Sequence, residues 1–297
     1  MARPSPWTVL GVPIDSVGRA GGTEHAPAAL RNAGIVAALG ARDAGDVAVR
    51  IRGEARDPAT GIVGSRDVLA MTPAIRAAVR ELVAAGERPL VLGGCCALLP
   101  GALAGVRDVH RRVGLAYLDG HVDVYDGETS PTGEAADMPV GVALGRGPRA
   151  WVDAADGASL EARDVIVLGA RDPDEAADIA WLLDHELADL TVSGPAALRR
   201  RGLASAGREA AARLADEPGR FWLGLDVDVL DESAMPATDY LMPGGLEWDE
   251  LADLLAGLGA SGALIGASVA CVNPDKDPGG ALVRRTAELL AGALGAR

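Results

Sequence analysis

Short apolar runs alternate with longer segments of helical periodicity along nearly the whole chain, and this alternation constrains the fold more than any other feature. The apolar runs are continuously hydrophobic, as expected for strands that are covered on both faces of a parallel sheet. Repeated strand-then-helix units predict one mostly parallel sheet with helices packed on it. We therefore predict an α/β fold.

The predicted strands and helices can be located from these patterns. The strands are 8–12, 46–51, 89–92, 113–118, 165–168, 190–192, 221–225 and 263–272. The helices between them include 27–39, 73–85, 173–187, 195–214, 248–258 and 280–294. Thr72 before Pro73 is typical of a helix start, with an N-cap residue followed by proline at the first helical position. No low-complexity linker divides the 297 residues, so a single domain over 1–297 is expected.

The charge balance excludes several classes of partner. Asp and Glu outnumber Lys and Arg 42 to 28, which gives a formal net charge of −14. Such a surface repels phosphate backbones and anionic lipids, so neither nucleic acid nor a membrane is expected as a partner, whereas a small cationic substrate suits the field. The N-terminal residues lack the pattern of a signal peptide. Three cysteines in no regular framework favour a reducing compartment, so we expect a cytoplasmic protein.

Chemically active residues directly follow three of the predicted strands. The sequences are Gly-Gly-Cys-Cys at 93–96, Asp-Gly-His-Val-Asp at 119–123 and Asp-Val-Asp at 226–228. In a parallel sheet these positions lie at the carboxyl edge, where such folds bind ligands. Because alternate residues of an extended segment point to one side, the acidic side chains and the histidine are expected to converge there.

Four aspartates at one sheet edge predict a metal site. Their carboxylates would repel one another unless a positive charge neutralised them, and oxygen-rich ligation with one imidazole suits Mn²⁺ better than a structural zinc. Two metal ions bridged by Asp119 and Asp226 could hold a hydroxide at neutral pH for attack on an electrophilic carbon. A lone Asp after a strand is more often a turn residue or helix cap, but both acidic motifs together favour the metal site.

In this order the three motifs resemble the metal motifs of the ureohydrolases, the family of arginase, agmatinase and formimidoylglutamase. The likeness spans nearly the whole chain. Segments 11–15 and 21–27 resemble the family's opening, 235–238 and 243–246 resemble the region after its last metal motif, and 272–274 resembles its final strand end. The resemblance implies a three-layer α/β/α fold and a homo-oligomer, either a trimer or a hexamer. It also implies two Mn²⁺ ions per chain and hydrolysis of guanidino or related C–N bonds.

The resemblance also assigns roles to residues by position. One metal would be held by Cys96, Asp119, Asp123 and Asp226, and the other by Asp119, His121, Asp226 and Asp228. Asp123 would orient the bridging hydroxide, and both Asp123 and His121 are expected to act in catalysis. Asp172 and Asp174 fall where family members contact the amino end of the substrate.

At the first metal motif, Cys96 replaces the usual histidine of the family, so that an imidazole ligand becomes a thiol. A thiolate favours softer metals such as Zn²⁺ or Fe²⁺, although some ureohydrolase relatives with cysteine at this position do bind Mn²⁺. Equally, Cys96 would be a buried apolar thiol if this metal were weakly bound or absent.

Two further departures concern the substrate. Ala136 replaces a histidine that the family uses for proton transfer, a loss that typically costs about 10²–10⁴-fold unless another group takes the role. Cys271 is expected to bind the substrate, because it stands where arginase-like members place a glutamate against the guanidinium. A guanidinium bound there therefore lacks a charge-assisted partner. Glu134 is the candidate for both substrate binding and catalysis, provided that it reaches the pocket. Alternatively, the substrate is less basic, such as an N-hydroxyguanidine, a formimino compound or an amide.

Three functional hypotheses follow from the sequence. The leading one is a hydrolase that cleaves a guanidino-type C–N bond. The second is the same fold acting on a formimino or amide C–N bond, and the third is a non-catalytic, metal-poor relative. The four aspartates and His121 weigh against the third, because uncompensated carboxylates at one edge are costly to keep.

Overall fold

The computed structural model describes residues 6–295 and contains one eight-stranded sheet in which every pair of neighbouring strands is parallel. The strand order is β2-β1-β3-β8-β7-β4-β5-β6. The strands are β1 Trp7–Val12, β2 Arg42–Asp46, β3 Arg88–Gly93, β4 Gly114–Leu118, β5 Val165–Leu168, β6 Thr191–Ser193, β7 Phe221–Asp226 and β8 Leu264–Ala270. This arrangement confirms the predicted α/β fold with a parallel sheet.

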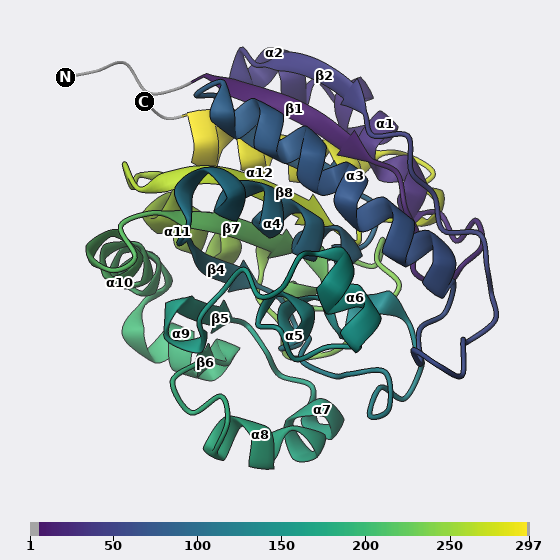
Figure 1. Ribbon diagram of the computed structural model, residues 1–297. Helices are drawn as coiled ribbons and strands as arrows, with labels where there is room; N and C mark the ends of the chain where they lie inside the picture. The colour runs from purple at the N-terminus through teal and green to yellow at the C-terminus, as the bar shows by residue number, and fades with distance from the viewer. Residues whose placement is uncertain (1–5, 296–297) are drawn as a thin grey trace.

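Helices cover both faces of this sheet, which gives three layers (Figure 1). They are α1 Ala26–Asn32, α2 Ile35–Leu39, α3 Ser65–Ala84, α4 Leu99–His110, α5 Pro139–Ala143, α6 Arg149–Ala154, α7 Pro173–Asp178, α8 Ala180–Asp184, α9 Pro195–Arg201, α10 Leu203–Asp216, α11 Trp248–Gly259 and α12 Ala281–Gly295. In Figure 1, α3 and α4 lie in front of the sheet and α11 and α12 lie behind it. Among residues 6–295, no helix is long and apolar enough to cross a membrane.

The inner strands are buried almost throughout, which accounts for their continuously apolar sequences. Seven of the eight strands lie within two residues of their predicted ends. The hydrophobic core therefore lies on both faces of the central strands. Their carboxyl ends are held in fixed positions at one edge.

The prediction for the second strand was wrong. The predicted run 46–51 shares only Asp46 with β2, which has a polar sequence, lies at the edge of the sheet and is exposed along its whole length. Arg31 of α1 anchors it through ion pairs with Asp43 at 2.9 Å and with Asp46 at 2.6 Å. A charged edge strand resists pairing with other chains, but it lacks the apolar pattern from which strands are predicted.

The predicted start of the third helix was also wrong. Helix α3 begins at Ser65 and contains Pro73 in its interior. Val68 and Met71 are buried and extend the apolar face of the helix by two turns before the proline. Burying two such side chains contributes about 1.5–3 kcal/mol each, which together matches or exceeds the ~3 kcal/mol cost of an internal proline.

Three other predicted helices are each divided into two, and three helices of the structure, α4, α5 and α6, were not among the predicted ones. The segment 27–39 breaks at Gly34, with φ 91°, and 195–214 breaks at Gly202, with φ 79°. The segment 173–187 divides at Ile179 between α7 and α8. Helix α4 is the longest of these three. It packs closely on α3 at Gly101, where a Cβ would lie 2.8 Å from a backbone oxygen of that helix.

Candidate metal centre

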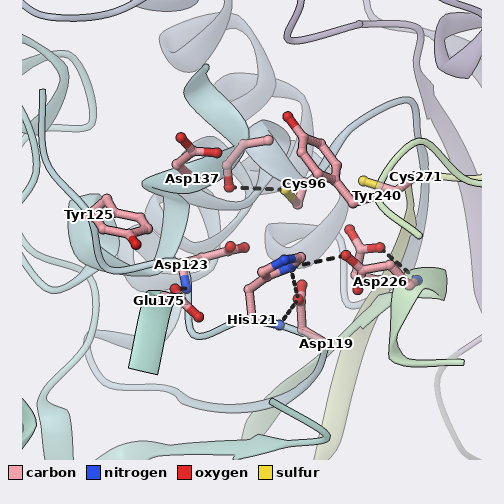
Figure 2. A pocket seen from close by; sticks show the side chains of 12 residues that line it. Cys96, Asp119, His121, Asp123, Tyr125, Asp137, Glu175, Asp226, Tyr240 and Cys271 are labelled. Atoms are coloured by element: carbon pink, nitrogen blue, oxygen red, sulfur yellow. Dashed lines mark hydrogen bonds and ion pairs between the residues drawn. The ribbon is translucent and has the colours of Figure 1, made fainter. Parts of the chain in front are cut away.

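The carboxyl ends of four adjacent strands bring the predicted motifs together. Strands β3, β8, β7 and β4 are neighbours in that order. Residues of the proposed site lie at or just after the end of each strand. Cys96 follows β3, Cys271 follows β8, Asp226 ends β7, and the segment 119–123 follows β4. Figure 2 shows these side chains converging on one pocket. The sequence prediction of one site at this edge therefore corresponds to the arrangement in the structure.

Close backbone packing fixes the loops that carry the two cysteines. Gly94 lies so near the chain after β1 that a Cβ would stand 1.7 Å from the carbonyl oxygen of Ile14. The N–H of Cys271 donates to the carbonyl oxygen of Gly94 at 2.6 Å. Gly94 therefore allows the turns after β1, β3 and β8 to approach one another.

Two residues of the site have positive φ without being glycine, namely Asp123 at 60° and Cys271 at 64°. This left-handed conformation costs an L-residue roughly 1–2 kcal/mol. Such conformations persist where the surrounding structure enforces them, and they gather at functional sites. Both side chains line the pocket.

The first group of potential ligands consists of Asp119, His121 and Asp228. Their ligand atoms all lie within 4.8 Å of one another. His121 Nδ1 lies 3.0 Å from Asp228 Oδ2 and 3.4 Å from Asp119 Oδ1. Burial lowers the pKa of His121, but the charge of Asp228 and hydrogen bonds to both aspartates raise it far above the ordinary value. This group offers oxygen and nitrogen donors and suits a hard divalent ion.

The second group consists of Cys96, Asp226 and Cys271, whose ligand atoms also lie within 4.8 Å of one another. A hydrogen bond with Cys271, together with burial, raises the pKa of Cys96 well above its ordinary value. The pKa of Cys271 is lowered by its hydrogen bond with Cys96, but burial and the charge of Asp226 hold it well above the usual range. Both thiols are therefore protonated unless a metal displaces their protons.

Asp123 lies beside these groups and is held by two residues that the sequence analysis missed. Its Oδ2 accepts a hydrogen bond from the Tyr117 hydroxyl at 2.6 Å. Glu175 at the start of α7 accepts backbone N–H groups from Val122 at 2.7 Å and from Asp123 at 2.9 Å. Tyr117 lies within an apolar strand, and Glu175 lies among other acidic residues in the first turn of α7, so neither stood out from its neighbours in sequence.

The electrostatics of the pocket fit a divalent cation. Burial, then the charge of Asp228, raises the pKa of Asp119 to about 6. Burial and neighbouring carboxylates raise the pKa values of Asp123 and Asp226 well above the ordinary range. Burial also raises the pKa of Asp228, but His121 outweighs this effect and lowers it. A bound cation would stabilise the ionised form of all four carboxylates.

The size of the pocket is also suitable for metal ions. Its volume is ≈ 40 Å³, which corresponds to roughly three water-sized occupants. The lining residues are Cys96, Asp119, His121, Asp123, Tyr125, Ala136, Asp137, Glu175, Asp226, Asp228, Tyr240 and Cys271. Carboxylates, one imidazole and two thiols around so small a space form a donor set for metal ions.

The other predicted site residues lie around this pocket. Asp172 caps α7 by accepting backbone N–H groups, and its Oδ2 lies 3.6 Å from His121 Nε2. Asp174 is exposed on the same helix. Glu134 accepts hydrogen bonds from the hydroxyls of Ser16 at 3.0 Å and Tyr240 at 2.9 Å. It therefore reaches the pocket lining through Tyr240, and its predicted catalytic and substrate-binding roles remain predictions.

Replacing Glu175 with alanine is expected to destabilise the protein by about 2–4 kcal/mol, because the two backbone N–H groups that it accepts would lose their buried partner. Urea-induced unfolding would measure this change. Asp174→Ala, one residue away on the exposed side of the same helix, is the matched control and should change stability by less than about 0.5 kcal/mol. Equal effects of the two substitutions would contradict this role for Glu175.

An all-parallel sheet with carboxylates, an imidazole and thiols gathered at its carboxyl edge defines an α/β protein with a candidate metal centre. The chain belongs to the arginase family, whose family model matches residues 5–295. It is 30% identical over 282 residues to an arginase of Bacillus caldovelox, covering 92% of each chain. It is 28% identical to an arginase of Brevibacillus brevis, covering 97% of each. The structure of the Bacillus caldovelox arginase superposes with a TM-score of 0.89 at 27% identity, covering 99% of each chain. The predicted family is thus confirmed.

Proposed function

We propose that this chain is a metal-dependent hydrolase that cleaves a C–N bond of a guanidino-type small molecule. The observation that carries the proposal is the convergence of Asp119, His121, Asp123, Asp226 and Asp228 on one small acidic pocket in a member of the arginase family. These aspartates and the histidine, with Cys96, are the residues that would hold the metal, and Mn²⁺ suits their oxygen-rich part. Bound divalent metal would supply an activated water at neutral pH and would polarise the substrate.

The residues of the chain supply positioning and proton transfer. Asp123 is held by Tyr117 through one oxygen and by Glu175 through the backbone, so its carboxylate is fixed against the pocket. A carboxylate so placed accepts the proton of the attacking water and returns it to the leaving amine. Asp137, the residue after Ala136, also lines the pocket and provides a further carboxylate there.

The substrate class is inferred from the charge of the pocket and from Ala136 and Cys271, the two positions at which the chain departs from the family pattern. The pocket carries many more carboxylates than cations, which favours a cationic or polar substrate such as a guanidine. Ala136 provides no proton-transfer group, and Cys271 provides no carboxylate for a guanidinium. These two positions favour a less basic group such as an N-hydroxyguanidine over a plain guanidine.

The same two positions support one alternative, in which the chain cleaves a formimino or amide C–N bond. A relative without catalytic activity is the third hypothesis. The family's homo-oligomeric state and the cytoplasmic location likewise remain predictions for this chain.

A substrate panel tests the proposal. Purified protein loaded with Mn²⁺, and separately with Zn²⁺ or Fe²⁺, is incubated with guanidino, N-hydroxyguanidino, formimino and amide compounds. Release of urea or hydroxyurea is expected. These products are diagnostic, because only guanidino-type substrates yield them. Release of formamide or ammonia alone would favour the alternative, and no turnover of any compound with any metal would contradict a hydrolytic function.

A further inference from the structure

Two of the three cysteines lie on the same side of the pocket as one aspartate. Cys96 follows β3, Cys271 follows β8 and Asp226 ends β7, and these three strands are adjacent in the sheet. The two sulfur atoms and a carboxylate oxygen lie within 4.8 Å of one another, and all three residues are buried. The rigid carboxyl ends of neighbouring strands thus position a compact group of two sulfurs and one oxygen.

The conformation of Cys271 directs its side chain into this group. Its backbone has φ 64° and is held there by the 2.6 Å hydrogen bond from its N–H to Gly94. Cys271 lines the pocket beside Asp226 and Tyr240 (Figure 2). The sequence predicts that Cys271 contacts the substrate, but its geometry joins it to Cys96 and Asp226.

The donor atoms of the two groups differ in kind. Asp119, His121 and Asp228 offer two carboxylates and an imidazole, which suit Mn²⁺. Two thiolates with one carboxylate form a softer set that selects Zn²⁺ or Fe²⁺ over Mn²⁺. Three protein donors also leave one coordination position open, as in catalytic rather than structural zinc sites.

We propose that Cys96, Cys271 and Asp226 form a thiolate metal position selective for zinc or iron(II), next to the oxygen-rich position of Asp119, His121 and Asp228. The pocket therefore binds two different metals rather than two equal Mn²⁺ ions. This inference goes beyond the proposed hydrolysis, since it concerns metal identity and needs no particular substrate. It assigns Cys271 to the metal rather than to the substrate.

Cobalt substitution tests the inference through absorption rather than through activity. Reduced, metal-free, full-length protein is titrated with Co²⁺, and a sulfur-to-cobalt charge-transfer band in the near ultraviolet is expected. The band should fall by about half in Cys96→Ser and in Cys271→Ser, because each removes one of two thiolates. Zn²⁺ should abolish the band by displacing cobalt, whereas equimolar Mn²⁺ should not.

Cys95→Ser is the matched control, because Cys95 is an equally buried neighbour whose thiol pairs with Ser16 outside the group. This variant should keep the full band. In a competition assay with a chelator, Cys96→Ser and Cys271→Ser should each lose more than about 10-fold in zinc affinity, and Cys95→Ser less than that.

Zinc-edge X-ray absorption of the unmodified protein provides a test that does not depend on any variant folding. Two sulfur neighbours at about 2.3 Å are expected. Only nitrogen and oxygen neighbours, a missing cobalt band, or a Cys271→Ser band equal to that of the wild type would each overturn the inference. Hydrolysis by the Mn²⁺-loaded protein, together with a missing band in the Co²⁺-titrated protein, would overturn the inference and leave the proposed function intact. A full band without turnover would support the inference and contradict the proposed function.

Discussion

An Asp123→Asn variant is expected to lose roughly 10²–10⁴-fold in hydrolytic rate while keeping its fold, because an amide cannot accept the proton of the attacking water. The variant keeps the size of the side chain and its hydrogen bond from the Tyr117 hydroxyl, which measures 2.6 Å in the unmodified protein. The backbone N–H of residue 123 still reaches Glu175. The measurement is the initial rate with the best substrate of the panel, together with a melting curve to verify the fold.

Metal content separates the two roles that Asp123 could play. If the variant retains its metal and loses its rate, Asp123 acts in proton transfer. If metal and rate fall together, Asp123 acts first as a ligand. Tyr117→Phe is the companion variant, since it removes only the hydrogen bond and should cost much less than the loss of the carboxylate. An Asp123→Asn rate within about tenfold of the unmodified protein would contradict the proposed role.

Metal-free protein is expected to lose stability as the pH rises from about 4 to 8, and added metal should restore it. Burial, with the charge of Asp228, raises the pKa of Asp119 to about 6. Burial also raises the pKa of Glu175 to about 7. A raised pKa in the folded state means that the stability is fully present below the unfolded pKa and is lost as the pH rises through the folded pKa.

The other charged groups of the pocket do not reverse this trend. The raised pKa values of Asp123, Asp226 and His121 contribute with the same sign. Asp228 has a lowered pKa and contributes with the opposite sign. Its contribution changes with pH only below the ordinary pKa of an aspartate, which lies outside the range from about pH 4 to 8.

Urea unfolding of chelator-treated protein at several pH values, with and without added Mn²⁺ or Zn²⁺, tests this expectation. At pH 8 a saturating metal should stabilise the protein by about 4 kcal/mol at a thousandfold excess over its dissociation constant. The effect should shrink at pH 5, where protons compete for the ligands. A midpoint that is constant between pH 5 and 8 in metal-free protein would contradict the electrostatic account of the pocket.

The sequence predicted the centre of the fold better than its margins, for a physical reason. Inner strands such as β4 and β7 are buried on both faces, so their apolar sequences reveal them directly. The edge strand β2 is exposed and is held by Arg31, so its charged sequence looks like a loop. Helix α3 packs along α4 and buries Val68 and Met71 before Pro73, and such tertiary packing overrides local helix signals.

The same distinction applies to the site. Asp119, His121 and the other motif residues follow apolar strands in sequence, and parallel strands place their carboxyl ends at one edge. Cys271 joins Cys96 only because β8 lies between β3 and β7, a strand order that local patterns do not contain. Glu175 of α7 accepts the backbone N–H groups of Val122 and Asp123, and a contact with distant backbone leaves no signal in the sequence.

The metal content of the purified chain shows whether the acidic pocket is a metal centre. The protein is incubated with Mn²⁺, Zn²⁺ or both under reducing conditions and desalted, and the bound metal is counted by mass spectrometry. About two metal ions per chain are expected, as for a two-metal hydrolytic centre, with zinc and manganese together when both are offered. Metal that stays well below one ion per chain, whichever metal is supplied, would contradict the metal centre and with it the proposed hydrolysis.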